Sequence, residues 1–121
     1  PGARKKRPNF VLYFPDTLRA ESHSGYGVPL DVSPNLAKFA KGGVQFDQAH
    51  VMHTQCAPSR ATMLTGRYMH VLGHRTQTHL IQDYEPNYFR ALKEAGYHVG
   101  FIGKNDAVSA DSVNLSDSRW T

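Results

Sequence analysis

The amino-acid sequence predicts an α/β domain with a largely parallel sheet and flanking helices. Strand-like and helix-like segments follow one another in the order strand, helix, strand, helix, helix, strand. The first strand-like segment is apolar on both faces, which is typical of strands in sheets that are covered on both sides. Both observations favour an α/β domain whose sheet is largely parallel.

Three segments are predicted to be strands. Residues 9–14, NFVLYF, form a continuous aromatic and aliphatic run, which indicates a buried strand. Residues 44–51, VQFDQAHV, alternate like a strand with one wetter face. Residues 97–103, YHVGFIG, are predicted to form the third strand, and residues 80–85, LIQDYE, a loop.

Three helices have recognisable ends. In residues 32–43, Ser33 is the predicted N-cap, Pro34 lies in the first turn and two glycines end the helix. The second helix has Pro58 in its first turn and stops at Gly66. The third lies in residues 85–96, with Pro86 near its start and a glycine at its end. The predicted inward-facing residues are Leu36, Phe39 and Ala40 in the first helix and Tyr88, Phe89 and Leu92 in the third.

The basic charge of the chain is concentrated near its start. The 121 residues carry a formal net charge of +4, and Arg4, Lys5, Lys6 and Arg7 account for all of the excess, because +4 minus 4 leaves zero. We therefore predict a basic flexible tail over residues 1–8 and no nucleic-acid partner. No run of eighteen apolar residues is present, so no membrane span is predicted, and the sequence indicates no compartment.

Three residues whose side chains can bind an ion or react with a substrate follow the predicted strands. Asp16 comes directly after the first strand, Cys56 lies a few residues beyond the second, and Lys104 follows the third. Ligands of parallel sheets gather at the carboxyl ends of the strands, which predicts a single anion site. The alternatives are that Asp16 caps a turn, that Lys104 is an ordinary surface lysine and that Cys56 is a small buried hydrophobe.

Residues 54–67, TQCAPSRATMLTGR, resemble the sulfatase signature, in which Cys-x-Pro-Ser-Arg leads into a helix that ends Leu-Thr-Gly-Arg. The matching residues are Cys56, Pro58, Ser59, Arg60, Leu64, Thr65, Gly66 and Arg67. Residues 9–21, 33–50 and 92–104 also resemble segments of this family. The resemblance implies that residues 9–106 are the amino-terminal part of an alkaline-phosphatase-like α/β sandwich, and residues 107–121 are predicted to be an irregular end.

The resemblance implies a role for the single cysteine. In cysteine-type sulfatases this residue is oxidised to formylglycine by an enzyme that reads the motif formed here by Cys56, Pro58, Ser59 and Arg60. The hydrated aldehyde has two hydroxyls: one attacks the sulfur of a sulfate ester, and deprotonation of the other expels sulfate. The implied partners are the formylglycine-generating enzyme and a sulfated small molecule or carbohydrate.

The same resemblance assigns the other site residues. Asp16 matches a metal-binding aspartate and would share a divalent metal with the group derived from Cys56; calcium is preferred, with magnesium or manganese as alternatives. Arg60 would hold the nucleophile, and Lys104 would contact the sulfate oxygens. One carboxylate and one diol are too few ligands for a divalent cation, so these 121 residues alone are expected to be inactive.

The histidines and two departures from the family pattern bear on the substrate. His70, His74 and His79 are candidates for substrate contact, with packing as the alternative, and their spacing does not fit a zinc finger. Thr17 stands where many sulfatases have a second aspartate, and Asp106 where many have a histidine. Besides a sulfatase, the sequence therefore leaves open a phosphonate or phosphodiester hydrolase of the same superfamily, or an inactive fragment that acts at most as a binding module.

Overall fold

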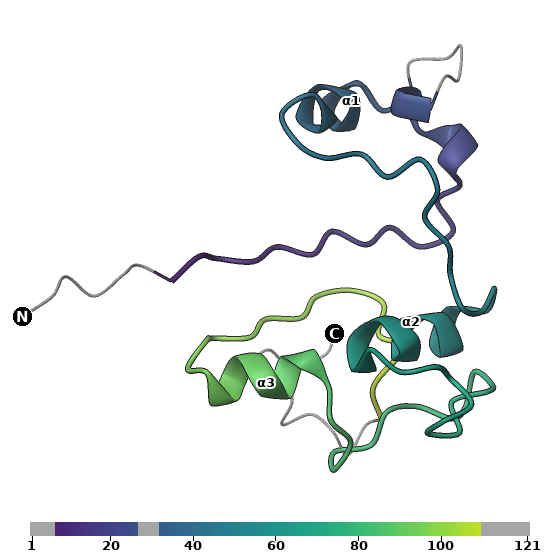
Figure 1. The fold of residues 1–121 in the computed structure, drawn as a ribbon, viewed down its shortest axis with the longest axis vertical. Helices are drawn as coiled ribbons and strands as arrows, with labels where there is room; N and C mark the ends of the chain where they lie inside the picture. The colour runs from purple at the N-terminus through teal and green to yellow at the C-terminus, as the bar shows by residue number, and fades with distance from the viewer. Residues whose placement is uncertain (1–6, 27–31, 110–121) are drawn as a thin grey trace, which may run out of the picture. The chain divides into compact units, whose positions relative to one another are not determined.

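The structure, a computed structural model, describes residues 7–26 and 32–109, which belong to two compact units, Pro1–Asp47 and Gln48–Thr121 (Figure 1). The described residues contain two short 3-10 helices and three α-helices. Most of the predicted basic tail and most of the predicted irregular end, residues 1–6 and 110–121, lie outside the described residues.

The first unit contains η1 (Ala20–Ser22), η2 (Ser24–Tyr26) and α1 (Pro34–Ala40). Ser33 is the N-cap residue of α1 and Pro34 its first residue, as predicted. The Ser33 hydroxyl, however, accepts a hydrogen bond from the Ser24 N–H, and the Ser24 hydroxyl accepts one from the Ser33 N–H, both at 3.0 Å. Ser33 therefore links the start of α1 to η2 and does not cap the helix with its side chain.

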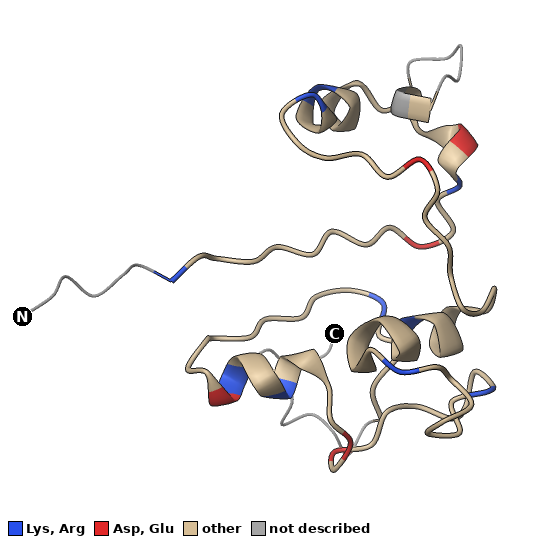
Figure 2. Ribbon diagram, viewed as in Figure 1, with Lys and Arg blue, Asp and Glu red and all other residues tan. Residues whose placement is uncertain are grey.

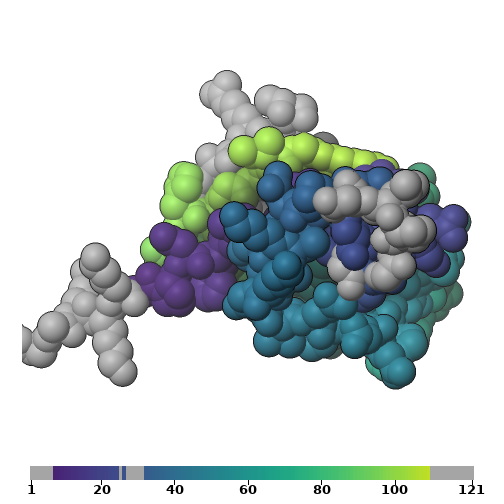
Figure 3. All heavy atoms as spheres, turned by 90° about the horizontal axis from the view of Figure 1, so that it is seen from above, coloured from purple at the N-terminus to yellow at the C-terminus, as the bar shows by residue number. Residues whose placement is uncertain are grey.

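The predicted apolar face of α1 is not buried within this unit. Phe39 is 82% exposed, Leu36 and Ala40 are half-buried, and no residue of α1 is buried. In the space-filling view, the segment that contains α1 forms part of the visible surface (blue in Figure 3). The helix was thus predicted correctly, whereas the predicted burial of its apolar face is not observed in this unit.

The second unit contains α2 (Cys56–Thr65) and α3 (Tyr88–Glu94). Helix α2 has Pro58 in its first turn and ends at Gly66, whose φ of 66° is in the left-handed region that suits glycine. The Gly66 N–H donates to the Thr62 carbonyl at 2.9 Å. Both ends of this helix confirm the prediction.

Helix α3 begins two residues after Pro86. Asn87 is its N-cap, and the Asn87 Oδ1 accepts a hydrogen bond of 3.1 Å from the Arg90 N–H. Gly96 follows the helix with a φ of 80°, and its N–H donates to the Lys93 carbonyl at 2.8 Å. The glycine stop was predicted, and the asparagine cap was not.

The core of the second unit lies between α2, α3 and the segments that follow them. It consists of Ala61, Leu64, Ile81, Phe89, Val99, Ala107 and Val108, with Tyr88, Leu92, Tyr97 and Phe101 packed against it. The inward-facing residues predicted for α3 are therefore confirmed. Packed residues continue past Asp106, because Ala107 and Val108 are both buried.

Aromatic rings stabilise this core. Phe89 meets Tyr88 and Phe101 edge to face, with ring centroids 4.8 and 5.8 Å apart. Burial raises the pKa of the Tyr88 hydroxyl, because the charged form would lose its hydration. The Tyr88 hydroxyl therefore stays protonated at neutral pH.

Within residues 7–26 and 32–109 no strand is present, so the structure does not confirm the predicted sheet. Among the described residues, one isolated parallel bridge joins Ile81, in the predicted loop, to Val108. The Ile81 N–H donates to the Ala107 carbonyl at 2.8 Å, and the Ser109 N–H donates to the Ile81 carbonyl at 2.9 Å. Exposure varies within the predicted strands: Val11 is 92% and Ile102 91% exposed, whereas Val99 is only 6% exposed and belongs to the core. In the described part of the chain, no helix has the length and apolar character needed to cross a membrane.

Candidate active site

Cys56 occupies the first position of α2. It is half-buried, and Gln55 before it has the extended backbone of an N-cap. The first N–H groups of a helix have no partner within the helix, and here the Ala57 N–H donates to the Gln77 side-chain oxygen at 2.8 Å. Gln77 therefore fixes the helix end that carries Cys56. A contact across twenty residues leaves no periodic signal, so sequence reasoning did not identify this glutamine.

Lys104 lies beside Cys56, although 48 residues separate them. After α3 the chain returns to the N-terminal end of α2 (Figure 1), where the Lys104 Nζ is 3.9 Å from the Cys56 Sγ. Basic residues occur both on α2 and on this returning segment (Figure 2). The structure thus brings together two of the residues that the sequence placed in one anion site.

Arg60 is the third member of this group. It lies one turn after Cys56 on α2, is only 6% exposed, and donates from its guanidinium to the Lys104 carbonyl at 3.3 Å. If Cys56 were only a packed core residue, Arg60 would be expected on the helix surface. The structure shows a buried Arg60 instead. The contact ties the backbone of Lys104 to the helix that carries Cys56.

The turn after Lys104 is held by Asn105. The Asn105 Oδ1 accepts from the N–H groups of Ala107 at 3.2 Å and Val108 at 3.0 Å, and its Nδ2 donates to the Val108 carbonyl at 2.7 Å. Asp106 inside this turn has a φ of 39°. The Asp106 carboxylate lies 3.0 Å from the Lys104 Nζ. Lys104 is therefore held through its carbonyl, through the following turn and through its ammonium group.

Asp16 belongs to the other unit and has a constrained backbone next to it. Its Oδ2 accepts a hydrogen bond of 3.3 Å from the Thr17 hydroxyl, and Thr17 has a φ of 59°. A β-branched residue in the left-handed region costs on the order of 1–3 kcal/mol. Strain of this kind is concentrated at functional turns, which favours a ligand role for Asp16 over a simple turn.

The described residues do not complete a metal site. Among residues 7–26 and 32–109, no group of three or more histidine, cysteine, aspartate or glutamate side chains is arranged to hold a metal ion. The Asp16 carboxylate accepts from the Thr17 hydroxyl, which stands next to it in the sequence. Asp16 could supply one oxygen ligand, but the described donors are too few to hold a divalent cation by themselves, because such a site requires about six or more oxygen ligands.

The three candidate histidines have different surroundings. His70 is exposed and stacks on Tyr68, with ring centroids 5.7 Å apart, and His79 is also exposed. His74 is only 3% exposed, its Nδ1 donates to the His79 carbonyl at 2.6 Å, and its Nε2 is 3.0 Å from a Glu85 carboxylate oxygen. Since both ring nitrogens face polar groups inside the protein, the contacts favour a structural role for His74.

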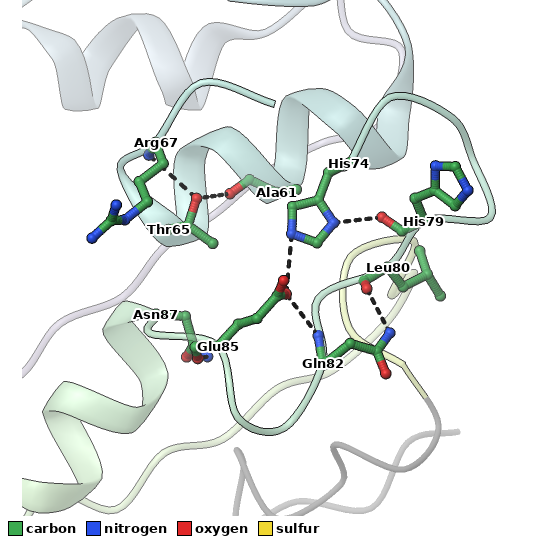
Figure 4. A network of polar contacts seen from close by, with 9 residues as sticks. All are labelled: Ala61, Thr65, Arg67, His74, His79, Leu80, Gln82, Glu85 and Asn87. Atoms are coloured by element: carbon green, nitrogen blue, oxygen red, sulfur yellow. Dashed lines mark hydrogen bonds and ion pairs between the residues drawn. The ribbon is translucent and has the colours of Figure 1, made fainter. Parts of the chain in front are cut away.

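Glu85 is the centre of the polar network shown in Figure 4. It is buried, and the carboxylate oxygen that meets His74 also accepts from the Gln82 N–H at 2.9 Å. The Gln82 side chain donates to the Leu80 carbonyl at 2.8 Å, and the Asn87 side chain donates to the Glu85 carbonyl at 3.0 Å. The network fixes the connection between α2 and α3. Sequence reasoning missed Glu85, although an acid next to an apolar segment is a weak signal of burial.

Comparison with known proteins identifies the family. The family model described as Sulfatase matches residues 8–114, so the chain belongs to the sulfatase family. The match contains Asp16, Cys56, Arg60 and Lys104. Membership in this family implies an alkaline-phosphatase-like α/β fold.

Individual relatives agree with the family. The chain is 31% identical over 104 residues to N-acetylglucosamine-6-O-sulfatase of Bacteroides thetaiotaomicron, covering 86% of this chain and 19% of the relative. It is 36% identical to bovine arylsulfatase A (80% of this chain, 20% of the relative) and 33% identical to human steryl-sulfatase (81% and 19%). The chain thus spans about a fifth of the length of these curated relatives. No solved structure gives a significant match.

Proposed function

We propose that this chain is the amino-terminal portion of a sulfatase that hydrolyses a sulfate ester or sulfamate. In this proposal Cys56 is converted to formylglycine, and a divalent metal assists it. The observation that carries the proposal is the 3.9 Å separation between the Lys104 Nζ and the Cys56 Sγ at the start of α2. A cation and a helix N-terminus together bind an oxyanion. A nucleophile formed at the adjacent Cys56 would then be placed to attack the central atom of that anion.

The residues of this chain supply the anion-binding part of the chemistry. The Lys104 ammonium would contact the sulfate oxygens, and the positive end of α2 adds to the same electrostatic potential. Neither group needs to reorganise when negative charge develops, since both are fixed before the substrate binds. Arg60 is proposed to hold the nucleophile and to keep Lys104 in place through its carbonyl.

The nucleophile and the metal complete the proposed site. A hydrated formylglycine would supply one hydroxyl for attack on sulfur and a second whose deprotonation releases sulfate. Pro58, Ser59 and Arg60 follow Cys56 as the motif that the formylglycine-generating enzyme would read. Asp16 would be one ligand of the metal, with calcium preferred over magnesium and manganese.

A sulfated carbohydrate or small molecule is the proposed substrate. One relative is named N-acetylglucosamine-6-O-sulfatase and another steryl-sulfatase, so both substrate types occur among proteins similar to this chain. The exposed His70 and His79 are proposed to line the substrate side of the pocket. His74 is proposed to be a supporting residue, because its ring nitrogens face a carbonyl and a carboxylate inside the protein.

The maturation of Cys56 gives the first test. We expect the whole protein, co-expressed with a formylglycine-generating enzyme, to show the aldehyde at position 56 by peptide mass analysis and to hydrolyse an aryl sulfate. Without this enzyme, or with Cys56→Ala, activity should fall by at least about a thousandfold, because the covalent route is lost. A fully active protein with an unmodified Cys56 would exclude the proposal.

A second candidate function is hydrolysis of a phosphonate or phosphate diester with the same nucleophile. The observation that favours it is the turn at Asp16, where Thr17 stands in place of a second acid and hydrogen-bonds the first one. The sulfate and phosphate oxyanions would be met by the same cationic groups, so the geometry around Cys56 does not separate them.

Paired substrates distinguish the two functions. We expect the matured whole protein to show a kcat/KM at least about tenfold higher for an aryl sulfate than for the matching aryl phosphodiester, a difference of about 1.4 kcal/mol in transition-state binding. The comparison uses one leaving group in both substrates, so that only the transferred group differs. A preference for the diester would replace the first candidate by the second.

A further inference from the structure

The ion pair between Lys104 and Asp106 lies within the proposed anion site. Its two charged groups are 3.0 Å apart, and the same Lys104 ammonium is 3.9 Å from the Cys56 Sγ. The two side chains are 44% and 40% exposed, so an ion from solvent can reach them. Asp106 is therefore an acid placed where the substrate is expected to bring negative charge.

The backbone holds Asp106 in this position. Its φ of 39° is unusual for a residue other than glycine, and asparagine and aspartate tolerate it best. Asn105 closes the turn on both sides of it through the N–H groups of Ala107 and Val108 and the Val108 carbonyl. Val108 is in turn bridged to the buried Ile81. A strained backbone fixed by this many contacts indicates that the position of the carboxylate matters.

We propose that Asp106 is a positioning residue for Lys104 that also limits how tightly the site binds a tetrahedral oxyanion. The inference rests on the proposed function of the site. The carboxylate orients the ammonium by accepting its hydrogen bond, and it repels an anion that approaches the same ammonium. Sulfate, the product, must leave before the next turnover, and a fixed negative charge beside Lys104 favours its release.

The variant Asp106→Asn tests the effect of the negative charge at this position while keeping the size of the side chain. The amide has the same size, tolerates the positive φ and keeps an oxygen that can accept from Lys104. The negative charge is removed and one oxygen becomes an amide N–H donor, so repulsion of the anion is lost and inorganic sulfate should bind about tenfold more tightly. In the matured enzyme we expect KM to fall by a similar factor, and kcat to fall because sulfate leaves more slowly.

Protection of the Cys56 thiol by inorganic sulfate measures this affinity without catalysis. The whole protein is produced without the formylglycine-generating enzyme, held in saturating calcium and alkylated with iodoacetamide at increasing sulfate. The concentration that halves the alkylation rate is compared between the unaltered protein, Asp106→Asn and the control Asp83→Asn. Asp83 is an exposed acid of the same unit, so its replacement changes the net charge equally.

The expected result is a half-protecting concentration about tenfold lower for Asp106→Asn and unchanged for Asp83→Asn. Damage to the fold would weaken protection and could not strengthen it. If sulfate protects Asp106→Asn no better than it protects the unaltered protein, the inference is overturned. If protection strengthens equally in Asp106→Asn and Asp83→Asn, the effect is one of net charge, and the inference is also overturned. Absence of sulfate protection in the unaltered protein instead overturns the proposed anion site itself.

Discussion

Replacing Glu85 by glutamine is expected to lower the free energy of unfolding of the whole protein by about 2–3 kcal/mol, because it replaces a buried carboxylate acceptor by a weaker neutral acceptor. The Glu85 carboxylate oxygen is 3.0 Å from the His74 Nε2 and also accepts from the Gln82 N–H at 2.9 Å. Glutamine can place one oxygen at the same position, but it lacks the negative charge, and its amide puts an N–H donor where the second carboxylate oxygen was. Chemical denaturation followed by circular dichroism measures the change.

A matched variant and a double-mutant cycle test the cause. Glu94→Gln makes the same chemical change at an exposed position of α3 and should alter stability by no more than about 0.5 kcal/mol. His74→Ala should cost much less in the Glu85→Gln background than in the unaltered protein, with a coupling of about 1–3 kcal/mol. Additive effects of the two substitutions would show that the pair does not act as a unit.

Replacing Arg60 by alanine is expected to lower turnover of the matured whole protein by at least about a hundredfold, the scale for loss of one preorganised charged donor. The buried guanidinium donates to the Lys104 carbonyl and carries positive charge one turn from Cys56. Arg60→Lys should restore little activity, because an ammonium does not reproduce the planar donor geometry of a guanidinium.

Two controls accompany the Arg60 measurement. Since Arg60 is part of the motif that the maturation enzyme would read, formylglycine content is measured by mass analysis and turnover is expressed per matured site. Arg75→Ala, at an exposed arginine of the same unit, should leave turnover within about twofold. A fully matured Arg60→Ala protein with near-normal turnover would remove Arg60 from the site.

Local features of the fold could be predicted because they depend on neighbouring residues. Pro34 and Pro58 lie in first turns, and Gly66 and Gly96 stop their helices through left-handed backbone angles. The inward face of α3 followed from its period, and Phe89 is in the core. The predicted strands are not confirmed among the described residues, and local pattern does not specify which distant backbone a strand pairs with.

The spacing of residues 56–67 predicted the family, which the match over residues 8–114 confirms, and it placed Cys56 at a helix start. Only the tertiary structure decided that Lys104 reaches Cys56, that Arg60 is buried against the Lys104 carbonyl, and that Asp106 pairs with Lys104. It also decided that His74 binds Glu85 inside the protein, where the sequence allowed contact with substrate. The physical reason is that helix starts and stops depend on the conformations open to a few adjacent residues. Contacts across 44 or 48 residues depend instead on how the core packs and where the chain returns.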